Sequence, residues 1–92
     1  MRFEHKTLGL TLELPDPDDL TQRQIERYME CYRRRDEADN AGKVVRAAVE
    51  AGWVKEPDIS VEMVGEMKPA VVRWYAAKID ALYAEVTAIP PE

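Results

Sequence analysis

His5 and Cys31 are the residues best suited to covalent chemistry, because an imidazole beside a thiol can activate it as a nucleophile. Each is the only residue of its kind in the chain. Such a pair must be in contact and oriented by a third group, and nothing in the spacing of the two residues predicts that contact. A lone cysteine beside the apolar stripe of a helix is usually a small, half-buried hydrophobe. We therefore expect no catalytic residue and no enzymatic activity.

A cluster of aspartates, Asp16, Asp18 and Asp19, offers oxygen ligands of the kind that calcium prefers. A calcium loop of the EF-hand type needs six ligand positions, a glycine and a distal glutamate, and prolines occupy the intervening places here. The simpler interpretation is a solvated loop whose carboxylates favour the positive end of the helix that follows. With a single cysteine excluding a multi-cysteine zinc site, we expect no metal and no cofactor.

Three consecutive arginines, Arg33, Arg34 and Arg35, could contact phosphates. Acidic residues follow them at once, and three successive helical residues point in different directions, so the run forms no single patch. The chain carries 13 Lys and Arg against 18 Asp and Glu, for a net charge of −5. A sequence-independent nucleic-acid binder needs a cationic face, so we expect a solvated helix end and no nucleic-acid partner.

The length of 92 residues allows one domain, with a thin core, and we take residues 1–92 as that domain. No apolar run approaches the ~20 residues that a membrane span requires, and residues 1–6 lack the apolar core of a signal peptide. A single cysteine excludes an internal disulfide. These features predict a soluble protein of a reducing cytoplasm with no membrane partner.

Residues 1–14 are expected to form a β-ribbon, because Leu8, Leu10, Leu12 and Leu14 alternate with smaller or polar residues. Residues 6–7 are the expected tip of a hairpin in which residues 2–5 pair with residues 9–13. A lone hairpin is unstable in water, so its leucine face must rest on helices or on another chain.

Residues 21–88 are expected to be helical, with a tail at 89–92 that its prolines keep out of a helix. Thr21 and Gln24 have the spacing of a capping box, and that helix loses definition near residues 36–40. A second helix starts at residue 39 or 40 and ends at Gly52, which suits the left-handed C′ position. A single helical turn at 60–65 precedes a last helix that starts at Pro69.

The expected fold class is therefore α+β, mostly α: a short N-terminal β-hairpin followed by three main helices and a one-turn helix. The helical stripes and the ribbon together predict a single core, which comprises Leu12, Leu14, Ile25, Tyr28, Met29, Val45, Val72, Tyr75, Ile79 and Leu82.

Exposed aromatic and leucine side chains are the remaining candidates for function, since such residues often dominate protein–protein contacts. Trp74 and Tyr75 are adjacent on one helix, about 100° apart, so a small domain will struggle to bury both; the alternative is that Trp74 is internal. Trp53 is most simply an anchor at the edge of the core. The candidate interaction residues are Leu8, Leu10, Trp53, Trp74, Tyr75 and Tyr83.

The order of several segments resembles phage tail assembly chaperones, small proteins encoded among the tail genes of tailed bacteriophages and prophages. The segments are Leu14-Pro15, Asp19 to Gln24, Val45 to Val54, Met67 to Trp74, Ile79 to Glu85 and Ile89 to Glu92. The resemblance implies a small, acidic, mostly helical protein in the cytoplasm of the bacterial host. It also implies binding to the tape-measure protein, and to tail-tube subunits, before the tail polymerises.

Two further possibilities stay open at this point. The same chain could be a structural virion protein, such as a head-decoration, connector or tail subunit, whose ribbon adds to a neighbour's sheet. The apolar seam at positions 72, 75, 79, 82 and 86 could receive a client helix or another copy of the chain, which would make a homo-oligomer.

Overall fold

Two strands, a short 3-10 helix and four α-helices follow one another in residues 1–88, the part of the chain that the computed structural model describes. They are β1 (Arg2–His5), β2 (Leu10–Glu13), η1 (Pro17–Asp19), α1 (Gln22–Arg34), α2 (Asn40–Glu50), α3 (Val61–Val64) and α4 (Pro69–Thr87). This order confirms the α+β, mostly α class, and adds a 3-10 turn in what was expected to be a loop. The expected tail at 89–92 lies outside the described residues.

β1 and β2 form the expected antiparallel hairpin, in which Phe3 lies opposite Leu12 and His5 opposite Leu10. Its connection takes residues 6–9 and not residues 6–7 alone. Gly9 has a φ of +64°, a conformation that glycine adopts readily, and its N–H donates to the Lys6 carbonyl at 3.3 Å. The turn therefore uses Gly9, and β2 begins one residue later than predicted.

Local end signals place the helices where the sequence predicts them. The Thr21 hydroxyl accepts from the Gln24 N–H and the Gln24 side chain accepts from the Thr21 N–H, so the capping box of α1 is complete. Asp39 caps α2 by accepting from the Gly42 N–H. Ser60 caps the one-turn α3, and Pro69 occupies the first turn of α4.

The end of α2 forms a Schellman motif. Gly52 has a φ of +81° and donates to the Val49 carbonyl, while Trp53 donates to the Ala48 carbonyl at 2.9 Å. This geometry turns the indole of Trp53 back onto the helix that has just ended. Trp53 is only 1% exposed, so it belongs to the core itself and not to the core's edge.

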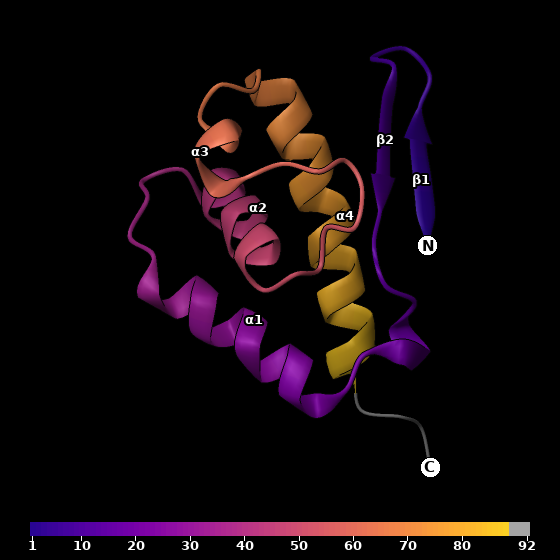
Figure 1. Cartoon of the computed structure of the whole chain (residues 1–92), viewed down its shortest axis with the longest axis vertical. Coiled ribbons are helices and arrows are strands. Elements are labelled where there is room, and N and C mark those ends of the chain that lie inside the picture. Colours follow the sequence, from indigo (N-terminus) through magenta and orange to yellow (C-terminus); the bar gives the residue numbers. More distant parts are fainter. Residues whose placement is uncertain (89–92) are drawn as a thin grey trace.

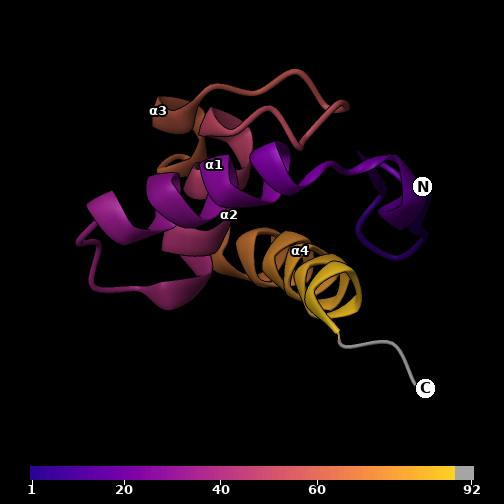
Figure 2. The ribbon, with the colours of Figure 1, turned by 90° about the horizontal axis from the view of Figure 1, so that it is seen from below.

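Helix α4 is central to the fold: α2 packs along it, and the hairpin lies beside it (Figure 1). Seen from below, α4 is almost end-on, α1 and α2 lie on one side of it, and the hairpin lies at the margin of the molecule (Figure 2). His5 of β1 touches Trp74 of α4, with ring centroids 5.6 Å apart. The ribbon's apolar face therefore rests on a helix of its own chain.

Every predicted core residue is buried except Met29, which is half-buried against the core. Met29 lies one position past Tyr28, and this angular offset turns it toward the rim of the α1 stripe. The core also contains buried residues outside that list, which are Cys31, Val44, Ala47, Ala48, Trp53, Val64 and Ala76. Small side chains on α2 allow the close approach of α1 and α4.

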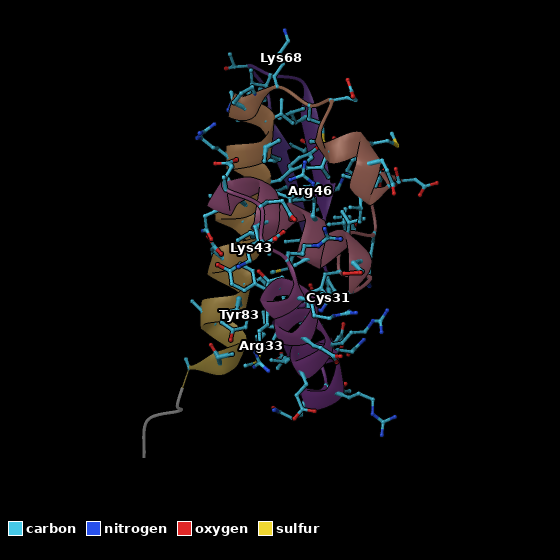
Figure 3. The ribbon with its side chains drawn as sticks, turned by 90° about the vertical axis from the view of Figure 1, so that its left-hand side faces the viewer. Cys31, Arg33, Lys43, Arg46, Lys68 and Tyr83 are labelled. Atoms are coloured by element: carbon cyan, nitrogen blue, oxygen red, sulfur yellow. The ribbon has the colours of Figure 1, made fainter. Side chains whose placement is uncertain are left out.

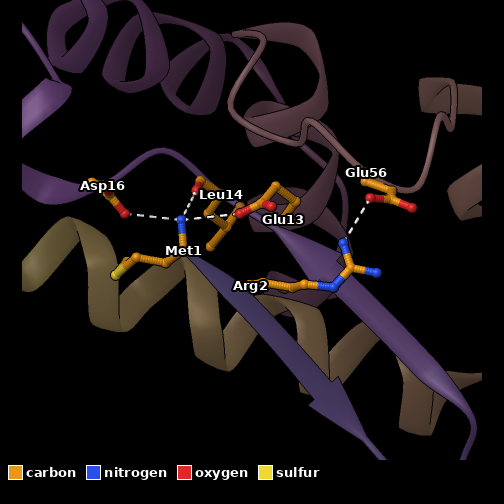
Figure 4. A network of polar contacts seen from close by, with 6 residues as sticks. All are labelled: Met1, Arg2, Glu13, Leu14, Asp16 and Glu56. Atoms are coloured by element: carbon orange, nitrogen blue, oxygen red, sulfur yellow. Dashed lines mark hydrogen bonds and ion pairs between the residues drawn. The ribbon is translucent and has the colours of Figure 1, made fainter.

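Main-chain pairing and charge hold the base of the hairpin. The Glu13 N–H donates to the Glu56 carbonyl at 2.7 Å, and the Lys55 N–H donates to the Glu13 carbonyl at 2.9 Å. Figure 4 shows the amino group of Met1 reaching the Leu14 carbonyl, Asp16 and Glu13, and Arg2 reaching Glu56 at 3.0 Å. The amino group donates hydrogen bonds to the carboxylates of Asp16 and Glu13, and these bonds, the one to Asp16 first, raise its pKa.

Candidate protein-interaction site

A groove of about 490 Å³ opens where α1, α2 and α4 meet. Its walls combine aromatic, apolar and charged side chains, which are Tyr28, Met29, Tyr32, Arg33, Asn40, Lys43, Val44, Asp80 and Tyr83. Figure 3 looks onto this side of the molecule, where Lys43, Tyr83 and Arg33 follow one another down the face. A hollow of this size accommodates a small molecule or a few side chains of another protein.

Aromatic rings form the floor of the groove. Tyr28 stacks on the buried Trp53, with centroids 4.5 Å apart and planes 21° apart, and the ring of Tyr83 lies 5.5 Å from that of Tyr28. Trp53 donates its indole N–H to the Gln24 carbonyl at 3.3 Å, which fixes the ring under Tyr28. Burial raises the pKa of Tyr28, so this phenol stays neutral at ordinary pH. The floor is therefore rigid and continuous with the core.

Tyr32 forms one wall and is held from two sides. Its hydroxyl donates to the Asn40 Oδ1 atom at 2.6 Å, and the Lys43 Nζ atom lies 4.3 Å from its ring centroid. The first contact joins the last turns of α1 to the first turn of α2, and the second is a cation–π contact. Tyr32 is thus held in place by contacts within its own chain.

Charges at the groove do not cancel within the described residues. Across residues 1–88, none of Arg33, Lys43 and Asp80 takes part in an ion pair. Partial desolvation raises the pKa of Asp80, although its side chain stays exposed. Two cations against one carboxylate make the groove locally positive on a chain whose net charge is −5.

A second apolar surface lies on the other side of α4, around the hairpin. Leu8 at the hairpin turn is 43% exposed, and Trp74 is half-buried against His5 and Tyr75. The Lys78 Nζ atom lies 5.2 Å from the ring of Phe3 and 5.8 Å from that of Trp74.

The six candidate interaction residues divide by burial. Trp53 and Tyr75 are 1% and 4% exposed, so in this structure they lie beneath the surface that a partner reaches. Leu10 and Trp74 are half-buried at the hairpin, and Leu8 is exposed there. Tyr83 is the one that lines the groove. Of the adjacent aromatics on α4, the fold buries Tyr75 and leaves Trp74 partly open.

Sequence reasoning missed Tyr32, Lys43 and Asp80 as parts of one groove. Tyr32 and Lys43 are eleven positions apart in the chain, and the turn that brings them together has no sequence signature. The available signal was the aromatic content of the α1 stripe, where Tyr28 and Tyr32 recur at i and i+4. That spacing indicates two rings on one face but not that the second is open to solvent.

The residues considered for chemistry are engaged elsewhere. His5 accepts a hydrogen bond from the Leu8 N–H through Nδ1 and packs on Trp74, whereas Cys31 is 1% exposed and receives a contact from Arg34 at 3.7 Å. Burial, and then a hydrogen bond with Glu50, raise the pKa of the Cys31 thiol, which opposes formation of a nucleophilic thiolate.

The arginine run is only partly solvated, which corrects the expectation for Arg35. Arg33 and Arg34 are exposed, but the side chain of Arg35 is 18% exposed and lies 3.5 Å from carboxylate oxygens of both Glu37 and Glu50. Arg35 follows the last turn of α1, and Glu50 ends α2, so this ion pair links the ends of the two helices.

The acidic cluster lies at the turn before α1. Asp16 pairs with the amino group of Met1 at 3.0 Å, and Asp18 and Asp19 belong to η1. Over residues 1–88, no three His, Cys, Asp or Glu side chains come together in a way that could hold a metal ion. Within the same stretch, no helix combines the length and the apolar character needed to cross a lipid bilayer.

Comparison with known proteins gave no match: no family model fits the sequence, and neither a curated protein nor a solved structure is similar to it.

Proposed function

We propose that this protein is a non-enzymatic assembly chaperone from the tail gene cluster of a tailed phage or prophage. In this proposal it works in the cytoplasm of the bacterial host, where it binds a helical segment of the tape-measure protein. The observation that carries the proposal is the open aromatic groove between α1, α2 and α4. The resemblance of the segments around Val45 to Val54 and Met67 to Trp74 gives the biological setting.

The lining of the groove suits a protein ligand. Tyr32 and Tyr83 offer large, rigid surfaces that combine an apolar ring with a polar tip, as in many binding hot spots. Met29 adds a flexible thioether that adapts to different apolar side chains, which helps a chaperone that meets several turns of a repetitive helix. A volume of about 490 Å³ admits a few side chains and not a whole helix, so a client would lie across the opening.

The charges favour a client segment that is apolar with acidic neighbours. Lys43 and Arg33 at the groove attract a carboxylate, while the net charge of −5 favours the solubility of the complex. A binding role of this kind requires no turnover. This is compatible with a buried, protonated Cys31 and a His5 that is occupied by packing.

Co-expression with the tape-measure protein encoded beside this chain tests the proposal. The expected result is a co-purifying complex and a larger soluble fraction of the client. Tyr83→Ala should reduce that fraction, whereas Trp74→Ala, a matched change on the hairpin side of α4, should not. Both residues are half-buried, so far-UV circular dichroism checks that each variant is folded.

Purified particles provide a second test. A chaperone is absent from the finished virion, so mass spectrometry of particles should find none of this chain. Stoichiometric presence in the particle would contradict the chaperone role and favour a structural virion protein. Failure to form any complex with the tape-measure protein, in soluble and folded samples, would contradict the choice of client.

A further inference from the structure

Within residues 1–88, the outer edge of β1 is a row of main-chain donors and acceptors with which no other strand pairs. Met1 and Leu14 exchange hydrogen bonds between the strands, since the Leu14 N–H donates to the Met1 carbonyl at 2.8 Å and the Met1 nitrogen donates back. In an antiparallel pair such positions alternate with positions whose N–H and C=O point away from the partner strand. The next pair, Arg2 with Glu13, therefore points outward on both strands.

β2 confirms this alternation directly. The outward groups of Glu13 are the ones that pair with Lys55 and Glu56. On β1 the corresponding outward residues are Arg2 and Glu4, and within residues 1–88 no other segment pairs with that edge. Figures 1 and 2 both show the hairpin at the margin of the molecule, with β1 as its outer strand in Figure 1. The fold thus covers one edge of the ribbon and leaves the other open.

We propose that this edge pairs with β1 of a second copy of the chain, antiparallel about a two-fold axis at Phe3. In a symmetric pairing of β1 with itself, the outward residues Arg2 and Glu4 must lie opposite outward residues of the second copy. Three registers of the strand meet this condition. Two of them oppose like charges, Arg2 to Arg2 or Glu4 to Glu4. Only the register centred on Phe3 opposes Arg2 to Glu4 of the second copy, and the two-fold repeats that contact.

Charge therefore selects one register from the three. Directly opposite side chains share a face of the sheet with Cβ atoms about 5 Å apart, which is within reach of an ion pair. Arg2 and Glu4 are both exposed, and they already lie 3.8 Å apart within one chain, so the four charges form a compact cluster across the axis. The two Phe3 rings meet at the axis on the face that carries α4.

The product is a four-stranded sheet in the order β2–β1–β1–β2. At both ends of this sheet, Glu13 of the outer strand β2 is already paired with Lys55 and Glu56 of its own chain. Charged residues on a short edge strand also discourage indiscriminate pairing, because a strand with another charge pattern meets an unmatched charge. The pairing is short, so the dimer is weak and depends on protein concentration.

Sedimentation velocity of the full chain over a range of concentrations tests this inference. The wild type should form dimers as the concentration rises. Arg2→Glu and Glu4→Arg should each weaken association about tenfold or more, because each replaces both symmetric attractions with repulsions. The double variant R2E/E4R should restore dimers, since it exchanges the charges and keeps them opposite. Glu56→Gln, which breaks only the ion pair inside the chain, should leave association unchanged.

A main-chain probe separates strand pairing from any other contact. Glu4→Pro removes an outward N–H that the hairpin does not use, so it should abolish dimers and preserve the fold by circular dichroism. The amides of Arg2 and Glu4 should exchange with solvent slowly only at concentrations where dimers form. A wild type that stays monomeric overturns the inference, as do dimers that survive Glu4→Pro or a charge swap that fails to restore them.

Discussion

Replacement of Trp53 by phenylalanine tests whether this indole is the anchor on which α1 and the groove rest. The side chain is 1% exposed, stacks on Tyr28 at 4.5 Å and donates to the Gln24 carbonyl at 3.3 Å. Phenylalanine keeps a ring against Tyr28 but loses the hydrogen bond, about 1 kcal/mol, and leaves a small cavity that costs about another 1 kcal/mol. The free energy of unfolding should fall by about 2 kcal/mol.

The matched control is Trp74→Phe on α4. Trp74 is half-buried and has no hydrogen bond from its indole within residues 1–88, so its replacement should cost less than about 1 kcal/mol. Thermal unfolding followed by circular dichroism should show a fall of about 8–16 °C for Trp53→Phe and a clearly smaller one for Trp74→Phe. Equal losses for the two variants would refute the assignment of Trp53 to the core and Trp74 to the surface.

The same two variants report on cooperativity, because each leaves one tryptophan in the chain. The buried residues form a single cluster that includes the hairpin and all four helices. Urea transitions followed by tryptophan fluorescence and by circular dichroism should therefore coincide in both variants. A fluorescence transition of Trp74 that precedes the loss of helix would show the hairpin detaching first.

Three other predictions concern single residues. Thr21→Ala removes half of the capping box of α1 and should lower the unfolding free energy by about 1 kcal/mol, measured by urea denaturation. Burial raises the pKa of Cys31 and leaves it 1% exposed, so a thiol reagent at pH 8 should label it slowly until urea unfolds the chain; rapid labelling of folded protein would contradict this. Burial also raises the pKa of Tyr28 above the unfolded value of 10.0. Its contribution to stability is therefore complete below pH 10 and lost above it, and a stability that stays constant from pH 9 to 11 would contradict this.

Local signals were enough to predict the two strands and the four α-helices of this fold, because each acts over a few residues. The Thr21–Gln24 box, the left-handed Gly52 and Pro69 each depend on main-chain groups within one turn. The hairpin tip was less well predicted, since a positive φ at Gly9 competes with its use as the first residue of a strand. The residues next to Gly9 in the sequence do not determine whether it belongs to the turn or to the strand.

The candidate site could be predicted only in part, because burial depends on how whole helices pack. Trp74 and Tyr75 have similar sequence surroundings, yet α2 covers one side of α4 and the hairpin only partly covers another. Arg35 was expected to be solvated because its pairing with Glu50 depends on the angle between α1 and α2. The groove depends on the same angle between α1 and α2. Residue spacing therefore predicts neither the Arg35–Glu50 ion pair nor the groove.

The groove and the β1 edge lie on opposite sides of α4, so each can be occupied without blocking the other. Trp74 faces the hairpin and Tyr83 the groove; they are nine residues apart, which at about 100° per residue places them about 180° apart around the helix. A dimer formed through β1 would therefore leave both grooves open. The two grooves of one dimer would bind neighbouring turns of a long helical client more tightly than a single groove would. Binding at the first groove raises the effective concentration of the client at the second. If so, Arg2→Glu should weaken binding of a client with several sites but not of a single-site peptide, whereas Tyr83→Ala should weaken both.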